Sequence, residues 1–426
     1  MNDKNNKFLK TAVAVFVSLA IAGLAFYAGY VTREMKMPKS LKDAEFVLET
    51  IDKYYDGDFD SNEFLKKAVT GALDRYSFFY TPSDYQNVTI EREGINTGKL
   101  GLMFYSGSTH VYSVSGNSPA DRAGIEEDGY VVAAKLNAAS EFTPINNYVD
   151  FDTFTSGIDK GIKIDLKIRY GEEERVYTLA KEDFNESYVW YADSQKSYGC
   201  IYDKSTGTWS LAEREKPLKS NVIDGYAYIK FSRFNGDAAK QLKLALDKMK
   251  ERGNKKLVLD LRNNGGGYMD ILEKIAAMLC PGSGNRPIAV AKFKSGEIYN
   301  FYMKGGSYDN YSFEKICILA NSNSASASEA LIGAMLDYDA SENKNVVQVY
   351  VSLAADGKYR TYGKGIMQST FKNDNGGALT LTTAHLYWPK SNVTIHGVGV
   401  TPETDARVHG VAPAAGVDAE LIAAMS

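Results

Sequence analysis

The second half of the chain alternates apolar strands with helices, and this alternation constrains the fold more than any other feature. "GYAYIKFSRF" (225–234) is strand-like, and "DAAKQLKLALDKMKERG" (237–253) has the apolar spacing of a helix that ends at a glycine. "KKLVLDLRNNGGG" is a buried strand that runs into glycines, and "EKICILANSNSASASEALIGAMLDY" is a strand, a turn of small residues and another helix. The alternation predicts an α/β core over residues 222–408.

Upstream of this core the pattern of polar and apolar residues changes between segments. Residues 37–90 carry apolar residues three and four apart, which predicts helices, one of them capped by Asp60 or Ser61. Residues 91–182 are short strands separated by glycine turns, which predicts a small β-rich module. Residues 183–221 are aromatic and polar without a clear period, and we interpret them as an insertion of unknown role. Residues 409–426 are interpreted as a C-terminal tail.

The N-terminus contains an uncharged apolar segment, Thr11 to Val31, "TAVAVFVSLAIAGLAFYAGYV". As a helix it would be about 31 Å long, which is enough for a bilayer core. Lysines precede it within residues 1–10, so we expect a signal anchor with a cytoplasmic N-terminus and the rest of the chain outside. The alternative is a cleaved signal peptide that uses Ala20-Ile21-Ala22, and this also exports the remainder.

Composition excludes several classes of function. The net charge is −4, so no basic face suggests nucleic acid. The three cysteines form no CxxC pair, which argues against a zinc ribbon and against a disulfide scaffold. We expect no metal and no cofactor. There are four histidines, so a mechanism that needs one has few to choose from.

The turn "SNSASASEA" (322–330) allows two interpretations. Ser326-Ala327-Ser328-Glu329 fits a capping box, with the serine at the N-cap and the glutamate at N3. The same geometry suits a nucleophile, because a serine at a sharp strand-to-helix turn is exposed and the helix N-terminus favours developing negative charge. Serine attacks only when a neighbouring base takes its proton.

The candidate bases are a lysine and two histidines. Lys364, in "YGKGIMQ", can serve if burial lowers its pKa, and a shift from about 10.4 to about 7 requires about 4.6 kcal/mol of destabilisation of the charged form. Gln368, four residues on, could orient the amine. His385 or His396 could complete a histidine triad, although neither has an obvious acidic partner nearby. "GKYRTYGKG" lacks the spacing of a phosphate loop, so we reject nucleotide binding.

Two glycine-containing segments complete the candidate site. The glycines of "LRNNGGG" (261–267) allow close approach of the backbone, and exposed N–H groups there could form half of an oxyanion hole, with the Ala327 N–H as the other half. "KLGLMFYSG", followed by "SPADRAGI", could form a groove that holds a free carboxylate while a strand pairs with the sheet edge.

In their order and in their residues, these motifs resemble those of the C-terminal processing peptidases, the tail-specific serine proteases that carry a PDZ domain. The resemblance covers nearly all of the chain after residue 40. It runs from "AVTGALDRYSFFYTPSDY" through "LDLRNNGGG" and "SASASEAL" to "LTLTTAHLYWP" and "IHGVGVTPE". It implies a crotonase-like, spiral α/β protease core, with the module at 91–182 as an inserted PDZ domain. It also implies that the PDZ domain can gate the active site.

The resemblance implies roles for individual residues, matched by motif position. Ser326 would be the nucleophile, Lys364 the general base and Gln368 its orienting partner. Gly266, or Gly267 one residue on, would form the oxyanion hole with Ala327. Four residues, at the start of a PDZ strand, would present the binding groove to the substrate's C-terminus: Leu100, Gly101, Leu102 and Met103.

Three departures from the family pattern stand out. The loop before Lys364 is expanded, which makes Lys358 a fallback for the base. The stretch 183–221 has no counterpart in the compact pattern. "DGYVV" stands where the family usually has Gly-Asp followed by an apolar pair.

The sequence therefore predicts a membrane-anchored extracytoplasmic serine endopeptidase with a Ser–Lys dyad, which captures protein C-termini in its PDZ groove and cleaves near them. The rival is a catalytically inactive peptide-binding module, tethered outside the membrane as a scaffold or sensor. The resemblance further suggests a homodimer formed through the N-terminal helices.

Overall fold

The computed structural model describes residues 38–139, 141–214, 222–282 and 285–426. The predicted membrane span at 11–31 and the N-terminus before it lie outside these residues. Within the described ranges, no helix is both long and apolar enough to cross a bilayer.

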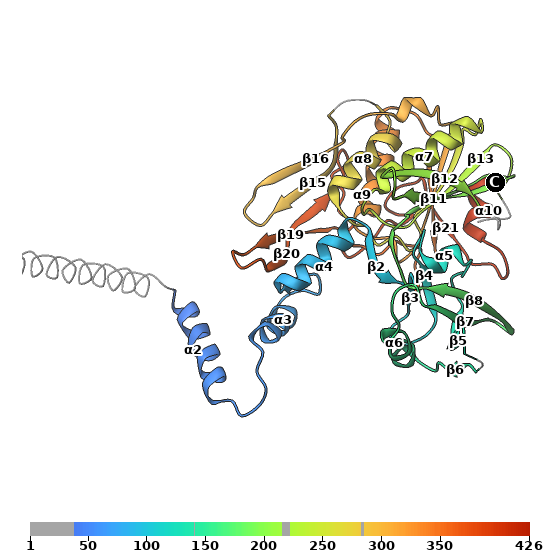
Figure 1. The fold of residues 1–426 in the computed structure, drawn as a ribbon. Helices are drawn as coiled ribbons and strands as arrows, with labels where there is room; N and C mark the ends of the chain where they lie inside the picture. The colour runs from blue at the N-terminus through green and yellow to red at the C-terminus, as the bar shows by residue number, and fades with distance from the viewer. Residues whose placement is uncertain (1–37, 140, 215–221, 283–284) are drawn as a thin grey trace, which may run out of the picture. The chain divides into compact units, whose positions relative to one another are not determined.

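The elements follow one another along the chain as shown in Figure 1. The helices are α2 (Lys39–Tyr54), α3 (Ser61–Ala72), α4 (Pro82–Arg92), α5 (Pro119–Arg122), α6 (Tyr148–Ser156), α7 (Ala238–Glu251), α8 (Met269–Leu279), the 3-10 helix η1 (Tyr308–Asn310), α9 (Ala327–Ser341) and α10 (Ala419–Met425). The strands are β1 (Phe78–Tyr80), β2 (Ile95–Lys99), β3 (Leu102–Phe104), β4 (Val111–Val114), β5 (Tyr130–Leu136), β6 (Thr143–Pro144), β7 (Lys163–Tyr170), β8 (Glu173–Ala180), β9 (Glu182–Asn185), β10 (Val189–Ala192), β11 (Ser197–Asp203), β12 (Thr208–Glu213), β13 (Tyr226–Phe231), β14 (Lys256–Asp260), β15 (Pro287–Phe293), β16 (Ile298–Tyr302), β17 (Lys315–Ala320), β18 (Val347–Ser352), β19 (Ile366–Lys372), β20 (Ala378–Tyr387) and β21 (Val408–Val411).

The chain divides into two compact units after Leu73. In the first unit, α2 and α3 are amphipathic helices, as their apolar spacing predicts. The expected cap of α3 is confirmed, because the Asp60 side chain accepts hydrogen bonds from the backbone N–H groups of Asn62 and Glu63 at 2.8 and 3.3 Å.

An eight-stranded sheet forms the centre of the second unit, in the order β12-β11-β10-β13-β14-β17-β18-β21. Strands β13, β14, β17, β18 and β21 run parallel to one another. The pairs β13–β10, β10–β11 and β11–β12 are antiparallel. The expected α/β core is therefore present. In such a sheet the loops at the carboxyl ends of the parallel strands meet at one edge, and both candidate loops, 261–267 and 321–326, follow parallel strands.

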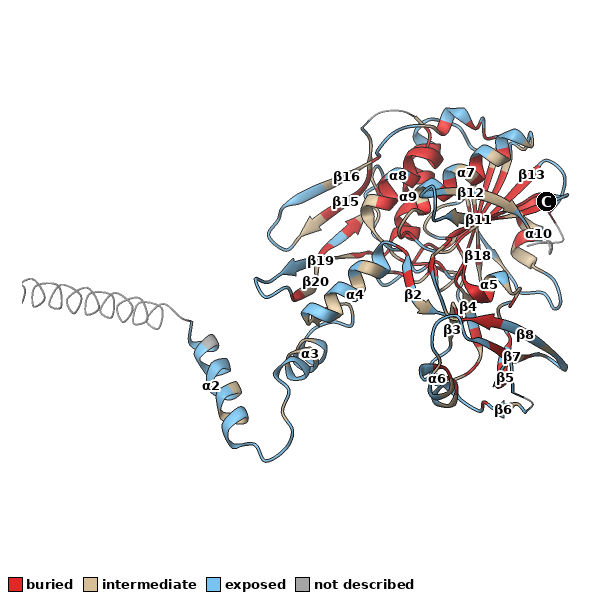
Figure 2. Cartoon of the chain, viewed as in Figure 1, coloured by how far each residue is buried: buried red, intermediate tan, exposed pale blue. Residues whose placement is uncertain are grey.

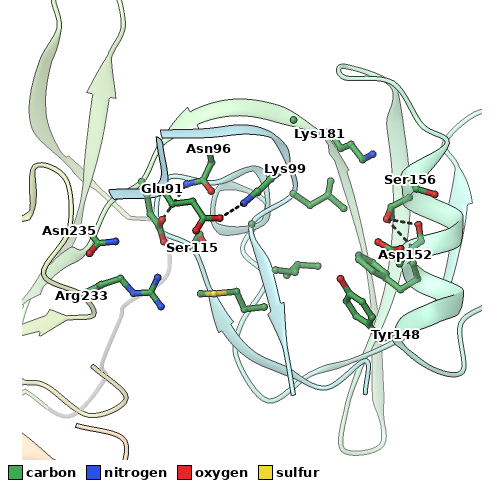
Figure 3. A pocket seen from close by; sticks show the side chains of 18 residues that line it. Glu91, Asn96, Lys99, Ser115, Tyr148, Asp152, Ser156, Lys181, Arg233 and Asn235 are labelled. Atoms are coloured by element: carbon green, nitrogen blue, oxygen red, sulfur yellow. Dashed lines mark hydrogen bonds and ion pairs between the residues drawn. The ribbon is translucent and has the colours of Figure 1, made fainter. Parts of the chain in front are cut away.

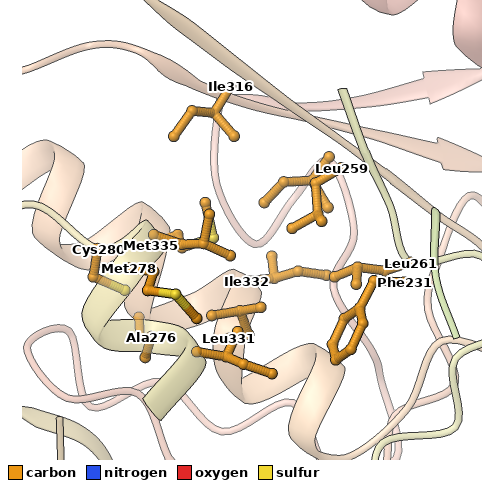
Figure 4. Packing of buried hydrophobic residues seen from close by; sticks show 14 of the residues in the cluster. Phe231, Leu259, Leu261, Ala276, Met278, Cys280, Ile316, Leu331, Ile332 and Met335 are labelled. Atoms are coloured by element: carbon orange, nitrogen blue, oxygen red, sulfur yellow. The ribbon is translucent and has the colours of Figure 1, made fainter. Parts of the chain in front are cut away.

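Helices cover both faces of this sheet. Alternate residues of β13, β14 and β17 point toward α7, α8 and α9 and form the largest apolar core, part of which is shown in Figure 4. The intervening residues, among them Tyr228, Val258 and Cys317, pack against α10 on the opposite face. Helix α9 is buried almost throughout, as Figure 2 shows, so the start of this helix is held rigidly.

Residues 95–185 form a smaller β-rich unit with its own core. A four-stranded sheet, β6-β5-β7-β8, packs with α5, α6 and the β3–β4 pair around Val111, Leu166 and Ile168. Strands β2 and β9 pair with each other where the chain enters and leaves. Among the described strands β3 pairs with β4 alone, so its other edge is open to a further strand.

A third sheet carries the segment after Lys364. Strand β20 pairs with β1, β15 and β19, and β16 extends the sheet beyond β15. Because β19 begins at Ile366, the "GKG" turn leads directly into this sheet.

Two parts of the chain are more regular than the sequence suggests. Of the stretch interpreted above as an insertion, the described residues 183–214 provide the end of β9 and strands β10 to β12, and β10 to β12 extend the central sheet. The stretch expected as a tail provides most of β21 and all of α10. The Arg262 guanidinium fixes α10 to the end of β14, since it lies 2.8 Å from Asp418 and 3.2 Å from Glu420.

We predict that Gly333→Ala destabilises the protein. In an open helix this change is favourable by up to about 1 kcal/mol, but here the added Cβ would lie 2.1 Å from Trp388 Nε1. Overpacking should therefore lower the free energy of unfolding by about 1–3 kcal/mol, measured by urea denaturation. Gly71→Ala in α3 meets no atom within 4 Å and serves as the control. Equal stability of Gly333→Ala and wild type would contradict the packing of Trp388 on α9.

Candidate active site

Ser326 occupies a strained turn between β17 and α9. Its φ of 57° and ψ of −112° correspond to the first central position of a type II′ turn, where glycine is the usual residue. The turn is closed by a hydrogen bond from the Ser328 N–H to the Ala325 carbonyl at 3.1 Å. A non-glycine residue in such a conformation costs about 1–3 kcal/mol and persists only where the surroundings enforce it. The half-buried serine is therefore held at a sharp strand-to-helix turn, in agreement with the prediction from the sequence.

The Glu329 carboxylate connects this turn to the lysine loop. One oxygen accepts the backbone N–H groups of Ser326 and Lys364, both at 2.9 Å. The other accepts the Thr361 hydroxyl at 2.5 Å and the Gly363 N–H at 2.7 Å. The capping-box interpretation is thus correct for Glu329, but the glutamate also fixes the backbone of the "GKG" turn.

Glu329 is completely buried. Burial raises the pKa of its carboxyl group, while the hydrogen bonds from Thr361, Gly363, Ser326 and Lys364 act in the opposite direction. All four neighbouring groups donate to the Glu329 oxygens, so the position requires a side chain that accepts hydrogen bonds.

Lys364 and Ser326 line the same cavity, which measures about 500 Å³. The lysine is half-buried, and its Nζ lies 4.5 Å from the centroid of the Tyr76 ring. The Tyr76 and Tyr362 hydroxyls lie 2.9 Å apart, and the Arg75 guanidinium lies 5.1 and 5.4 Å from the centroids of these two rings. The segment 75–76 therefore forms one wall beside the amine.

The environment lowers the pKa of Lys364. Burial has the largest effect, because it disfavours the charged ammonium. The Arg75 cation acts in the same direction, whereas the negative charges of Glu329 and Asp74 oppose it. A lysine needs such a shift before it can act as a base near neutral pH.

Gln368 lines the same cavity on β19. Its amide nitrogen donates to the Thr382 hydroxyl at 3.1 Å. Within the described residues, no hydrogen bond of 3.5 Å or less joins Lys364 Nζ to Gln368 or to Ser326. The three side chains share one cavity but are not connected in this conformation, and catalytic hydrogen bonds often tighten only when substrate binds.

The glycine loop meets the serine turn at close range. A Cβ on Gly266 would lie 2.9 Å from the Ala327 nitrogen and 2.7 Å from the Ala325 carbonyl, so only glycine fits. The Gly266 N–H donates to Asn264 Oδ1 at 3.0 Å. Gly267, the second candidate for the oxyanion hole, is exposed and lines the cavity too.

The two candidate histidines and Lys358 lie outside the cavity that contains Ser326. The rings of His385 and His396 lie 5.2 Å apart beside the lysine loop, but neither residue lines that cavity. Lys358 lines a separate cavity, with Asp356 and Glu403. The geometry therefore brings Lys364, rather than these residues, close to Ser326.

The groove residues lie in the smaller β-rich unit. Leu100, Gly101, Leu102 and Met103 line one cavity of about 430 Å³, opposite the Tyr148 face of α6 (Figure 3). Gly101 has a φ of 88°, and a Cβ there would lie 2.1 Å from Ser118 Cβ. The turn before β3 therefore requires a glycine.

Sequence reasoning missed two residues that build the site. Asn264 is buried, its amide nitrogen donates to the Phe231 carbonyl at 2.9 Å, and its backbone carbonyl accepts the Ala325 N–H at 3.0 Å. Tyr76 lies under Lys364 from a distant part of the sequence. An asparagine directly before three glycines, at the end of an apolar strand, was a sequence signal for Asn264. No local pattern indicated Tyr76.

Comparison with known proteins identifies the catalytic core. Residues 225–406, which include Ser326, Lys364 and Gln368, match the profile of "Peptidase family S41". This segment is therefore similar to the peptidases of that family. The "Probable CtpA-like serine protease" of Staphylococcus saprophyticus is 26% identical over 398 residues, which cover 92% of this chain and 69% of the relative.

Two further proteins, both named as C-terminal processing enzymes, are similar. The "Carboxyl-terminal-processing peptidase 2, chloroplastic" of Arabidopsis thaliana is 29% identical over 346 residues, or 80% of this chain and 59% of that protein. A solved structure of a photosystem II D1 C-terminal processing protease aligns with a TM-score of 0.45 and 19% identity, covering 83% of this chain and 84% of that one. The named sequence relatives confirm the expected resemblance to C-terminal processing peptidases and the assignment as a serine-type peptidase.

We predict that Ser326→Gly is more stable than Ser326→Ala. Glycine relieves the positive φ that alanine retains, so the free energies of unfolding in urea should differ by about 1 kcal/mol. Ser328→Gly is the matched control. Ser328 is helical, and its hydroxyl donates to the Asn264 carbonyl at 2.8 Å, so this variant should be less stable than wild type. If Ser326→Ala proved more stable than Ser326→Gly, the strained conformation described for Ser326 would be wrong.

Proposed function

We propose that the chain is a membrane-anchored extracytoplasmic serine endopeptidase, which uses a Ser326–Lys364 dyad to cleave proteins near C-termini captured by a PDZ domain. The observation that carries this proposal is the shared cavity, which is lined both by a serine on a strained turn and by a half-buried lysine with a lowered pKa. It matches what a serine nucleophile with a lysine base requires.

The proposed reaction runs in two halves. Neutral Lys364 accepts the Ser326 hydroxyl proton as Oγ attacks the scissile carbonyl carbon, and the resulting ammonium returns that proton to the leaving amine. The acyl-enzyme ester is then hydrolysed by a water that the lysine deprotonates in the same way. A rotation of the flexible lysine side chain from the Tyr76 ring toward Ser326 is part of this proposal.

The tetrahedral oxyanion would form at the N-terminus of α9. The Ala327 N–H and an N–H of the glycine loop are the proposed donors, and the helix dipole adds to their effect. Because the Gly266 N–H donates to Asn264, the loop donor is either Gly266 after a small rearrangement or Gly267.

Capture of the substrate is proposed for the 91–182 module, acting as a PDZ domain. Strand β3 has an open edge, so an extended peptide could pair with it while the Leu100–Met103 turn holds the terminal carboxylate. Anchoring through residues 11–31 would keep this machinery at the membrane surface, and dimerisation remains part of the proposal.

A mutational comparison tests the proposed chemistry. We expect the full-length protein to cleave an unstructured protein, and Ser326→Ala and Lys364→Ala each to lose at least about 100-fold in kcat/KM while still binding peptides. The opposite result is expected if the chain is a catalytically inactive peptide-binding module. In that case wild type would bind C-terminal peptides and cut nothing, and neither variant would differ from it.

The dependence of activity on pH tests the role of Lys364. The base must be neutral, so kcat/KM should rise as pH passes upward through the lysine pKa. Asp74→Asn removes a negative charge that raises this pKa, so the rising limb should move to lower pH. Arg75→Gln removes a positive charge that lowers it, so the limb should move to higher pH.

The control for these charge changes is Lys344→Gln, which lies beyond the C-terminus of α9 and should leave the rising limb in place. Shifts of Asp74→Asn and Arg75→Gln in the same direction would contradict Lys364 as the titrating base.

A further inference from the structure

Two cavities of the second unit share part of their lining. Glu91, Arg233 and Asn235 border both the groove beside β3 and the cavity that contains Ser326. A peptide that ran from the groove to the nucleophile would therefore pass these residues. Their chemistry can select substrates at positions between the captured end and the scissile bond.

Among these three residues, Arg233 alone carries a positive charge. It follows β13 in the loop that leads to α7, and its side chain is exposed. In Figure 3, Arg233 and Asn235 approach the groove from the side opposite Tyr148 and Asp152 on α6. The arginine also borders a third cavity, lined by Met103 and Glu186, so it stands at the junction of all three.

Glu91, Arg92 and Glu186, which line the same cavities, have hydrogen-bond or ion-pair partners of their own. Glu91 lies 3.4 Å from Lys99, and Arg92 lies 3.1 Å from Asp270. Glu186 accepts hydrogen bonds from the Asn96 amide and the Tyr188 hydroxyl. Across the ranges that the structure describes, Arg233 has no acidic side chain within the 4.0 Å of an ion pair. Its five N–H donors are thus available to a ligand.

We propose that Arg233 selects substrates that carry an acidic side chain between the captured C-terminus and the scissile bond. The inference rests on the proposed function, because it assumes that one peptide spans the groove and the catalytic cavity. An arginine fork matches the two oxygens of a carboxylate, which a solvated lysine would not do as selectively.

The size and form of the effect follow from the exposure of Arg233. A solvent-screened ion pair should change affinity by about three- to tenfold rather than by orders of magnitude. Arg233 would contact a substrate side chain rather than the reacting atoms, so it should act on ground state and transition state alike and appear in KM rather than in kcat. The effect should weaken as ionic strength rises.

The test uses full-length protein and three quenched-fluorescent peptides. The peptides share an apolar cleavage segment and an apolar free C-terminus, and differ only in a central Glu-Glu-Glu, Gln-Gln-Gln or Lys-Lys-Lys block. We expect wild type to prefer the glutamate peptide by about three- to tenfold in kcat/KM. Arg233→Gln should abolish this preference through KM, and Arg233→Glu should reverse it toward the lysine peptide. Arg169→Gln is the matched control, since its guanidinium faces Tyr130 away from these cavities.

Binding to Ser326→Ala protein, followed by fluorescence anisotropy, provides a second measurement that needs no cleavage. Equal affinity for all three peptides, or a preference that survives Arg233→Gln, would overturn the role of Arg233.

Peptides with an amidated C-terminus test whether Arg233 instead binds the terminal carboxylate of the substrate. If Arg233→Gln weakens binding of the glutamine peptide and amidation removes that difference, Arg233 binds the terminal carboxylate and the proposal is wrong. If binding shows the charge preference but nothing is cleaved, the proposed catalysis fails and the assignment of Arg233 stands.

Discussion

The buried carboxylate of Glu329 is the interaction on which the candidate site depends. It joins the first turn of α9 to the loop that carries Lys364, through four hydrogen bonds from two segments more than 30 residues apart. Hydrogen bonds to a charged group contribute about 1.5–3 kcal/mol each, whereas a buried carboxylate without partners is strongly unfavourable. The same four contacts therefore stabilise the fold and fix the relative positions of the serine and lysine backbones.

This arrangement explains how Ser326 can keep a conformation suited to glycine. Helix α9 is buried along its length, Asn264 holds the glycine loop against the turn, and Glu329 accepts the Ser326 N–H. The surroundings offset the strain of one residue and leave its hydroxyl at the cavity. The side chain that must rotate in the proposed reaction, Lys364, is in contrast only half-buried.

Much of the core could be predicted from the sequence, because its signals are local. The strand that ends at Ala320 and the helix that starts at Ala327 follow from an apolar run, a small-residue turn and a glutamate at N3. The ring of Tyr76 under Lys364 could not be predicted, since it depends on a contact between residues nearly 290 positions apart. The strands within 183–214 could not be predicted in the same way, because β10 is buried on both faces and shows no alternation of polar and apolar residues. The membrane segment stays a prediction.

The attachment of α10 has a consequence for the glycine loop, because the two are joined through Arg262. Leu421, Ala424 and Met425 are buried against the sheet, and Arg262 ties the start of this helix to the strand before the glycine loop. Loss of α10 would uncover the apolar face of the sheet beneath it. It would also remove two carboxylates that hold the Arg262 guanidinium, and with them part of the support of the loop beside the nucleophile.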